Sequence, residues 1–444
     1  MFTNIKKILI LGAPLIIGPS SEFLLYVIDT VMIGHLGLKY LAAIGIATLF
    51  AEVLWAIIWP MSPITQGIIA KLYGRSTQSP EDQQAIGPVL QNALIVAFSL
   101  GGIAVLFASQ SYLILSTLYD DPVLISLAES YITLVKWSIP LGAFFYTFYG
   151  FFSGVKLTKI IVITSIELNA LNIVFDYILI YGKFGFPAMG IEGAAIGTLL
   201  AHLIGLLHVV LYMTLSKKTQ VFSFFRFISI RTDLLIEISK GLVPLVLQGT
   251  FIFLVYLLYE SIVSKMGLQN LAITHILLML LEFSYIAVAG FSTGASILIG
   301  HCLGSNDKLL AIRYVYANTI ISIIIGLIFF AAVWMYPAFF IGLFNSEQEI
   351  ILLGTPVLQN LSIVLFIATL GYSIEIIFSH NGSGNFILWT EIITCCFLLI
   401  GLSFVLTTYF DSGVNGAWLS LGLYTLFRAV GLFGGVVAGK WLEA

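Results

Sequence analysis

Long apolar runs, each interrupted by only a few polar residues, recur along the whole chain. Most are at least as long as the roughly 20 residues that an α-helix needs to cross a hydrocarbon core of about 30 Å. A membrane-spanning segment must satisfy its own backbone hydrogen bonds, so we predict helices and not strands. We expect twelve spans, at residues 8–35, 42–72, 86–112, 123–154, 159–183, 189–215, 236–264, 270–303, 309–336, 349–380, 385–408 and 413–439. The predicted fold class is an all-α membrane protein.

The pattern repeats itself at a constant offset, which aligns 37–74 with 267–304 position by position. Both stretches are apolar helices that carry one acid, Glu52 in the first and Glu282 in the second. A second match aligns 190–194 (GIEGA) with 413–417 (GVNGA) at a similar offset. We therefore predict two pseudosymmetric six-helix lobes related by an axis along the membrane normal. The predicted boundaries are an N-lobe at 1–220, a cytoplasmic linker at 221–235 and a C-lobe at 236–444.

Composition agrees with a bilayer environment and excludes several classes of protein. Hydrophobic residues make up 59% of the 444 residues and charged residues only 9%, and the mean hydropathy is +1.06. Soluble domains carry roughly 25% charged residues. A net charge of −3, without a basic stripe, argues against a nucleic-acid partner. Three cysteines give no disulfide framework.

Lysine and arginine fall mostly on one side of the predicted helices. On the other side are only Lys39, Lys183 and Lys265. The positive-inside rule therefore predicts that both termini are cytoplasmic. We expect the protein to be a multi-pass protein of the inner (cytoplasmic) membrane. The first apolar run continues through Glu22 and Asp29 without a small-residue cleavage site, so we interpret it as a retained span and not a signal peptide.

Acidic residues are unusually frequent at membrane depth, where each ionisable group costs at least a few kcal/mol. Bases at similar depth are few, chiefly Lys136 and Arg428. An acid-rich interior favours protons, metal cations or organic cations as cargo and disfavours anions. The acids are Glu22, Asp29, Glu52, Glu167, Asp176, Glu260, Glu282, Glu375 and Glu391.

Two polar stripes stand out in the first lobe. Asp29 follows Glu22 by close to two helical turns, which puts both carboxylates on one helix face, and Asn169, Asn172 and Asp176 form a second stripe. Facing stripes could hold a proton or a sodium ion, because a carboxylate in an apolar environment binds a proton more tightly and amide oxygens suit hard cations. The alternative is that these groups only make hydrogen bonds between packed helices.

The remaining acids have less specific settings. We expect Glu22, Glu52, Glu260 and Glu282 to line a substrate cavity or to form a second protonation site, with a packing role as the alternative. The matching positions of Glu52 and Glu282 suit a pair that faces across a central cleft. We expect Glu375 and Glu391 to be structural residues or to lie at the rim of a cavity. Glu167 is out of phase with Asp176, and we expect it to pair with Lys136, for which Glu129 competes.

Enzyme signatures are absent from the sequence. It contains no HExxH, DDxxD or Walker motif, and no Ser or Cys nucleophile with a suitably placed His. Without a nucleotide site, transport would have to be driven by an ion gradient, and we predict no cofactor other than the coupling ion, H⁺ or Na⁺.

Several segments resemble the multidrug and toxic compound extrusion (MATE) transporters, prokaryotic members included. They are VIDTVMIGHLG in the first span, NIVFDYILIYGKFGFPAMGIEGAAIGT across the fifth and sixth, and IGHCLG at the end of the eighth. The resemblance covers essentially the whole chain and implies two lobes in a V shape. It implies a first-lobe cation site at Asp29, Asn172 and Asp176, with Thr198 as a fourth member. NorM-like members are similar in the seventh span but carry an acid where this chain has Phe251 or Ile252.

The sequence thus predicts a multidrug efflux antiporter that exports cationic, amphiphilic organic compounds in exchange for H⁺ or Na⁺ by alternating access. We expect small-molecule organic cations and membrane lipid as its partners, and a monomer. The alternatives are a lipid-linked precursor flippase of the same superfamily, which should have a basic cleft, an ion channel, or a membrane-embedded enzyme.

Overall fold

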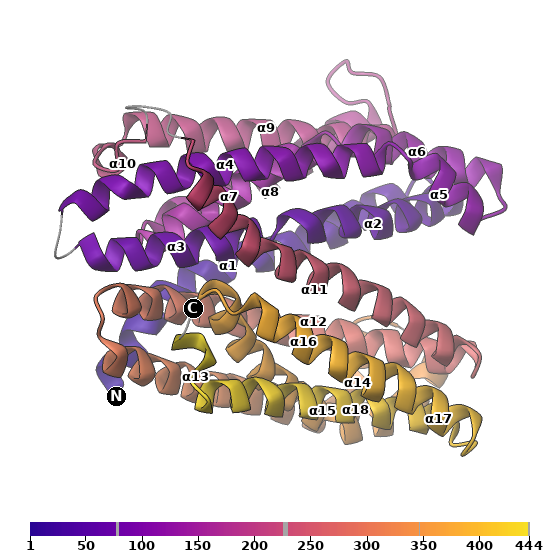
Figure 1. The fold of residues 1–444 in the computed structure, drawn as a ribbon. Helices are drawn as coiled ribbons and strands as arrows, with labels where there is room; N and C mark the ends of the chain where they lie inside the picture. The colour runs from indigo at the N-terminus through magenta and orange to yellow at the C-terminus, as the bar shows by residue number, and fades with distance from the viewer. Residues whose placement is uncertain (77–79, 225–229, 346, 443–444) are drawn as a thin grey trace. The chain divides into compact units, whose positions relative to one another are not determined.

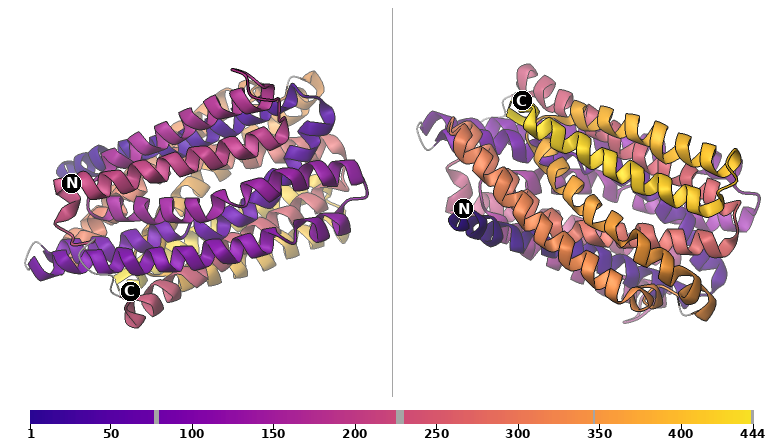
Figure 2. Two further views of the ribbon diagram at one scale, coloured as in Figure 1. Left: turned by 90° about the horizontal axis from the view of Figure 1, so that it is seen from above. Right: turned by 90° about the horizontal axis from the view of Figure 1, so that it is seen from below.

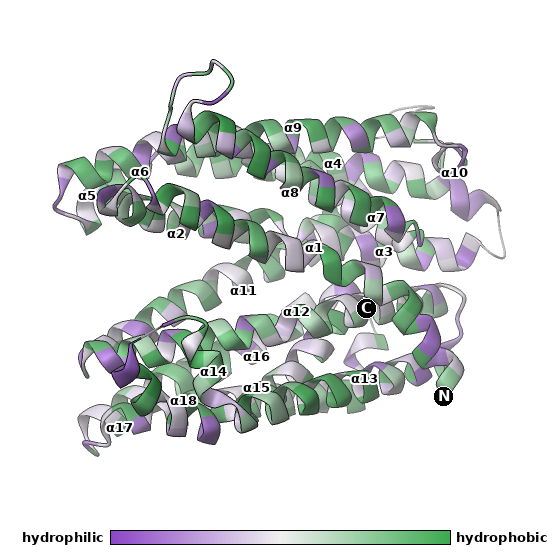
Figure 3. Ribbon diagram, turned by 180° about the vertical axis from the view of Figure 1, so that it is seen from behind, coloured by the Kyte–Doolittle hydropathy of each residue, from purple (hydrophilic) through white to green (hydrophobic). Residues whose placement is uncertain are grey.

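The computed structural model describes residues 1–76, 80–224, 230–345 and 347–442, except for the side chains at positions 22, 23, 26, 27, 38 and 80. Over these residues the regular structure is entirely helical. Eleven of the described helices are long and apolar enough to cross a membrane, and a shorter apolar helix is Pro122–Val135. Apolar residues predominate along the helices (Figure 3). The chain is an integral, multi-pass membrane protein.

The chain forms two compact units. The first, called here the N-terminal unit, comprises 17–242 and 300–306, and the C-terminal unit comprises 1–16, 243–299 and 307–444. Besides α12 (Leu268–Gly304), whose last five residues belong to the N-terminal unit, two long helices, α1 (Phe2–Gly34) and α11 (Thr232–Ser264), contribute to both units. Each passes from one unit to the other within a few residues of a proline, Pro14 or Pro244, and the offset of the longer repeat relates these two prolines. The lobe boundaries given above stay a prediction.

The N-terminal unit is built around the end of α1 and the nine helices that follow it. In this unit α8 packs against α9, α3 packs against α4 and α7, and α6 packs against α2 and α9 (Figure 1). The helices are α2 (Leu38–Ile58), α3 (Met61–Ser76), α4 (Pro80–Ala108), α5 (Ser111–Leu118), α6 (Pro122–Val135), α7 (Ser138–Gly154), α8 (Thr158–Tyr181), α9 (Ile191–Leu215) and α10 (Lys217–Gln220).

Prolines interrupt two of the predicted spans. The span at 42–72 divides into α2 and α3, and the span at 123–154 divides into α6 and α7. A proline ring clashes with the carbonyl four residues earlier. For Pro63 that carbonyl belongs to Trp59, and for Pro140 it belongs to Lys136, the residues at which the two breaks occur. The local sequence therefore explains both interruptions.

The C-terminal unit repeats the arrangement with its own helices. Here α15 packs against α13 and α18, which lie on either side of it (Figure 2). A π-helix, η1, interrupts the predicted span at 385–408. The elements after α11 are α12 (Leu268–Gly304), α13 (Lys308–Met335), α14 (Pro337–Gly342), α15 (Gln348–His380), α16 (Gly384–Thr394), η1 (Cys395–Leu402), α17 (Ser403–Thr408), α18 (Gly413–Val437) and the short 3₁₀ helix η2 (Lys440–Leu442).

Local signals fix the helix ends that determine the depth of the acidic residues. Gly182 adopts a left-handed conformation (φ +65°) directly after α8, so this helix ends little more than one turn after Asp176. The Asp121 side chain accepts hydrogen bonds from the backbone of Val123 (2.9 Å) and Leu124 and starts α6. Both signals are readable in the sequence.

Candidate functional site

Asp29 on α1 and Asp176 on α8 face each other inside the N-terminal unit. Their carboxyl groups are close enough to interact directly. Asp176 is fully buried, and Asp29 is half-buried. Two carboxyl groups this close together, one of them fully buried, repel each other when both are charged, which favours the uptake of a proton or another cation.

The buried oxygens of this pair lack protein donors. Apart from the contact between the two carboxyl groups, neither oxygen of Asp176 receives a hydrogen bond from the described residues, and Oδ1 of Asp29 receives none either. The same holds for Oδ1 of Asn172, one helical turn before Asp176. Buried acceptors are normally satisfied, and unsatisfied carboxyl and amide oxygens on neighbouring turns of one helix suit a small cation.

Asn172 and Thr198 connect α8 to α9 beside the carboxyl pair. The Nδ2 group of Asn172 donates a hydrogen bond of 3.2 Å to Oγ1 of Thr198. The Asn172 carbonyl oxygen has no donor among the described residues and is available as an acceptor. Thr198 also interacts with the hydroxyl group of Tyr131 on α6, which lies near both aspartates and Glu52. Four helices thus contribute polar groups to one site.

Gly197 provides the space that the Asp176 carboxylate occupies. A Cβ atom at Gly197 would lie 1.9 Å from Oδ1 of Asp176 and 3.2 Å from its backbone nitrogen. No side chain larger than hydrogen fits there while the carboxylate keeps this position. The close approach of α8 and α9 at Gly197 therefore sets the direction in which the Asp176 carboxylate points.

Asn169 lies about one helical turn before Asn172 on α8 and continues the polar stripe of that helix. Its Nδ2 group donates a hydrogen bond of 2.6 Å to Oγ of Ser21 on α1, while its Oδ1 lacks a donor among the described residues. Near the other end of α8, the Tyr181 hydroxyl donates a 2.7 Å bond to the Met32 carbonyl. These two contacts hold α1 against α8 above and below the Asp29–Asp176 pair.

Glu22, Glu52 and Glu282, for which the sequence suggested no specific partner, lie on three different helices. Glu22 is on α1, but its side chain is outside the described part of the structure. Glu52 on α2 is exposed and near Tyr131, and Glu282 on α12 is exposed and near Tyr285 and Tyr372. Their role in a substrate cavity stays a prediction.

Glu260 belongs to a pair on the C-terminal unit. Its Oε1 lies 3.0 Å from Nδ1 of His275 on the neighbouring helix α12. The histidine is exposed and the glutamate half-buried. This partner gives Glu260 a structural contact, and the predicted second protonation role remains untested.

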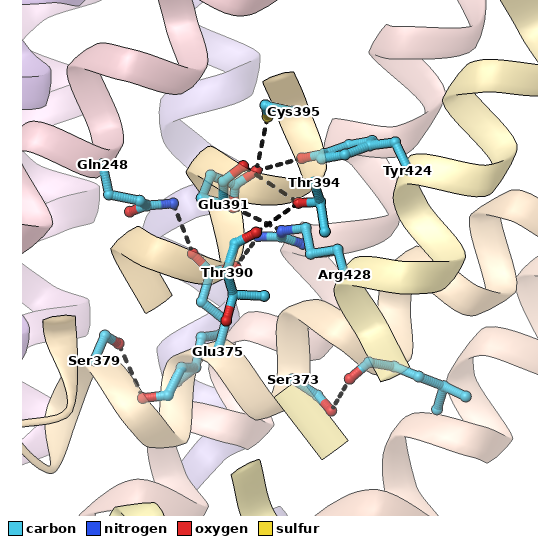
Figure 4. A network of polar contacts seen from close by, with 12 residues as sticks. Gln248, Ser373, Glu375, Ser379, Thr390, Glu391, Thr394, Cys395, Tyr424 and Arg428 are labelled. Atoms are coloured by element: carbon cyan, nitrogen blue, oxygen red, sulfur yellow. Dashed lines mark hydrogen bonds and ion pairs between the residues drawn. The ribbon is translucent and has the colours of Figure 1, made fainter. Parts of the chain in front are cut away.

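A buried ion-pair network lies in the C-terminal unit (Figure 4). Arg428 on α18 contacts Glu375 on α15 through Nη2 and Glu391 on α16 through Nε, the latter at 2.8 Å. The Tyr424 hydroxyl donates a 2.6 Å bond to Glu391, and Gln248 Nε2 donates a 3.1 Å bond to Glu375. Both acids therefore have full sets of partners, which agrees with the structural roles expected for them.

The two units place polar groups at different repeat positions. The offsets of the two sequence matches give each residue of the N-terminal site a counterpart in the C-terminal unit. All four counterparts belong to the buried apolar core of the C-terminal unit: Tyr259 for Asp29, Cys395 for Asn172, Leu399 for Asp176 and Leu421 for Thr198. The C-terminal unit therefore has no equivalent of the aspartate pair at this place.

The ion-pair network of the C-terminal unit likewise has no equivalent at the corresponding positions of the N-terminal unit. By the offset that aligns 190–194 with 413–417, Glu391 corresponds to Leu168 and Arg428 to Gly205. A Cβ atom at Gly205 would lie 3.4 Å from the Leu168 side chain, an apolar contact between α8 and α9. Phe251 and Ile252, where NorM-like members have an acid, pack against the apolar core of the C-terminal unit.

One expected pair was wrong, and two site residues were missed. Glu167 contacts Nδ1 of His208 on α9, while Lys136 donates a 3.2 Å bond to Oγ of Ser109. The partner is the adjacent α9, since α8 and α9 pack side by side. Tyr131 and Gly197 were missed because no acid or amide pattern marks them, although Gly197 stands in the small-residue run GAAIGT.

The donor set fits a hard cation better than a transition metal. No group of three or more His, Cys, Asp and Glu side chains that could hold a metal ion occurs within the described ranges. Two carboxylates, an amide oxygen and a hydroxyl are the oxygen ligands of hard cations, and the carboxyl pair can also share a proton. The geometry thus allows either H⁺ or Na⁺.

Comparison with known proteins gives consistent matches over the chain. The MatE family model matches residues 14–178 and again 244–407, so its two starts are related by the same offset as the longer internal repeat. The probable multidrug resistance protein NorM of Photorhabdus laumondii is 23% identical over 97% of this chain and 94% of its own length. The protein of the same name from Agrobacterium fabrum is 26% identical over 75% of this chain and 71% of its own length.

Solved structures show the same fold. A MOP superfamily transporter from Pyrococcus furiosus superimposes with a TM-score of 0.90 at 20% identity, over 99% of this chain and 97% of that one. The eukaryotic MATE transporter AtDTX14 superimposes with a TM-score of 0.84 at 20% identity, over 100% of this chain and 97% of that one. The architecture of twelve helices in two lobes, predicted from the sequence, is confirmed.

Proposed function

Because the chain belongs to the MatE family and is a transporter, not an enzyme, we propose that it is a multidrug efflux antiporter driven by H⁺ or Na⁺. Its substrates are cationic, amphiphilic organic compounds, and it works by alternating access. The multidrug resistance proteins among its relatives support the substrate class. The aspartate pair of the N-terminal unit supports the coupling.

One observation carries this proposal. Asp29 and Asp176 place two carboxyl groups together, with buried oxygens that no protein donor satisfies in the described part of the chain. Binding a cation there neutralises a negative charge beside the fully buried Asp176. A bound cation and an organic cation that needs the same negative charge would exclude each other, which is the requirement for exchange.

The first helix gives this charge change a mechanical connection. Asp29 lies on α1 in the N-terminal unit, while the start of the same helix, up to Ile16, belongs to the C-terminal unit. A shift of α1 that follows cation binding therefore acts on both units. A lipid-linked precursor flippase would need basic groups for a pyrophosphate headgroup, whereas this site is acidic.

Efflux of a fluorescent organic cation from proteoliposomes, under separately imposed proton and sodium gradients, tests the proposal. We expect one of the gradients to drive efflux by the wild type and Asp29→Asn to abolish the gradient dependence. The matched control is Glu167→Gln, which changes another membrane-embedded acid but keeps a group that can hydrogen-bond His208. Normal gradient-driven efflux by Asp29→Asn would disprove the assignment of the coupling site.

A further inference from the structure

A cavity of about 560 Å³ opens in the N-terminal unit at the ends of the helices that carry the aspartate pair. Its lining includes Leu36 after α1, Tyr40 on α2, Ser130 on α6, Ile180 on α8, and Gly190 and Glu192 at the start of α9. We call this cavity the outer vestibule. At about 30 Å³ per water molecule, it has room for a hydrated monovalent ion.

The vestibule lies directly along the helices from the aspartate pair. Ile180 follows Asp176 by one helical turn, or about 6 Å, and Leu36 follows Asp29 by two turns, or about 10 Å. On α6, Ser130 is the neighbour of Tyr131, which interacts with Thr198. Every helix that contributes to the site thus also leads to the vestibule.

An apolar layer separates the two. Ile33, Ile180 and Ala194 lie one turn from Asp29, Asp176 and Thr198 on the same helix faces, on the side of the vestibule. Their exposed fractions are 1%, 1% and 3%. At this level α8 and α9 touch closely, since a Cβ atom at Gly193 would lie 2.6 Å from the carbonyl carbon of Leu179. Ile180 also lines the vestibule, so a single turn of buried apolar residues lies between the vestibule and the aspartate pair.

The charge of the vestibule suits a cation. Glu192 is exposed and is the only charged group among the described residues that line it. It stands in the first turn of α9, where its negative charge offsets the positive end of the helix dipole. Lys39 and Lys183 are not lining residues, and Lys183 extends over the ring of Tyr177, 6.0 Å from its centre.

From these observations, and resting on the proposed function, we infer that the outer vestibule is the entry route of the coupling cation from the non-cytoplasmic side. Glu192 attracts the cation at the mouth, and the hydroxyl groups of Tyr40 and Ser130 replace part of its water. The layer of Ile33, Ile180 and Ala194 opens when α1 or α6 moves, since α8 and α9 are in backbone contact there.

Proteoliposome exchange measured against external H⁺ or Na⁺ concentration tests this route. For Glu192→Gln we expect the half-saturating concentration of the driving cation to rise about three- to tenfold, because the attracting charge is lost, with the maximal rate kept. Asp120→Asn is the matched control, since it removes an exposed acid of the same unit that does not line the vestibule. Melting temperatures of both variants identify any folding defect.

A second measurement is independent of Glu192. Ser130→Cys in a Cys396→Ser background, which removes the exposed natural cysteine, is treated from outside with a positively charged, membrane-impermeant thiol reagent. We expect Ser130→Cys to be labelled and its exchange to be slowed severalfold, and the background to be unaffected.

The outcomes separate the two proposals. If Asp29→Asn abolishes coupling while both Glu192→Gln and labelled Ser130→Cys keep the wild-type cation dependence, the entry route is wrong and the proposed function stands. If Glu192→Gln instead changes only the half-saturating concentration of the organic cation, the vestibule is a substrate site and the inference is overturned. If neither gradient drives the wild type, both proposals fail.

Discussion

Single residues decide whether the carboxyl pair can hold a cation. The Asp176 carboxylate keeps its direction because Gly197 has no side chain, and its unsatisfied oxygens make it available to a cation. Sequence reasoning identified Asp29, Asn172 and Asp176 from helical spacing, and Thr198 through the family resemblance. It did not find Gly197, because a glycine in a run of small residues looks the same whether it supports packing or a ligand.

We expect Gly197→Ala to impair coupling with little effect on stability. The new methyl group would meet the end of the Asp176 side chain at 1.9 Å but its backbone nitrogen only at 3.2 Å, so the carboxylate loses its position while the helices shift by no more than a few tenths of an ångström. Cation-driven efflux should fall by about tenfold or more, since ångström-scale misplacement of a reacting group has effects of that size.

Gly205→Ala is the control for this substitution. It lies on the same helix α9, and its Cβ atom would meet Leu168 at 3.4 Å, close to ordinary packing distance. Efflux assays and melting curves on both variants check the prediction. Equal efflux by the two variants would show that the position of the Asp176 carboxylate does not matter.

At the scale of helices, the two units use their polar residues in different ways. In the N-terminal unit α1 and α8 present acceptors without donors among the described residues, whereas in the C-terminal unit α15, α16 and α18 share a network in which Arg428 satisfies Glu375 and Glu391. The π-helix η1 begins one turn after Glu391 and contains Leu399, the counterpart of Asp176. Duplication supplied the same helices twice, and the polar positions then diverged.

We predict that Arg428→Met strongly destabilises the protein. It leaves two buried carboxylates without their cation, and breaking such a network costs about 3–5 kcal/mol. The melting temperature in detergent should fall clearly. The triple variant Glu375→Gln, Glu391→Gln, Arg428→Met removes the charges together, so it should recover most of the lost stability and still transport.

Loss of cation coupling in a stable triple variant would contradict this structural role. It would show that the C-terminal network takes part in coupling, which its complete set of partners does not suggest.

At the scale of the whole molecule, the charge distribution predicts an orientation that the helix arrangement by itself leaves open. Arginine and lysine gather on the side predicted to be cytoplasmic, and Lys39, Lys183 and Lys265 fall on the other. The outer vestibule is at the end of the N-terminal unit that carries Lys39 and Lys183, so the proposed entry route depends on this orientation.

Reporter fusions test the orientation. A green fluorescent protein fused after Ala444 should fluoresce, because it would stay in the cytoplasm. Alkaline phosphatase inserted after Phe184, an exposed residue between α8 and α9, should be active, because it would be exported. Inactive phosphatase at that site together with a dark C-terminal fusion would mean the opposite orientation and would move the vestibule to the cytoplasmic side.

The sequence by itself determined the helical membrane fold, the duplication and the helices that carry the aspartates. These follow from the length of apolar runs, from matching residues at a fixed offset and from the helical period, all of which are local properties of the chain. Even the breaks at Pro63 and Pro140 follow from local backbone geometry.

Only the tertiary structure decided which polar groups meet. Periodicity places Glu167 and Lys136 on their helices but does not determine how the helices are rotated about their axes. In the packed structure Glu167 contacts His208, and Arg428 contacts two acids that are distant from it in the sequence. The same packing brought Tyr131 and Gly197 to the aspartate pair and left a cavity beyond it. Contacts between helices depend on the fit of many side chains at once, which no single stretch of sequence contains.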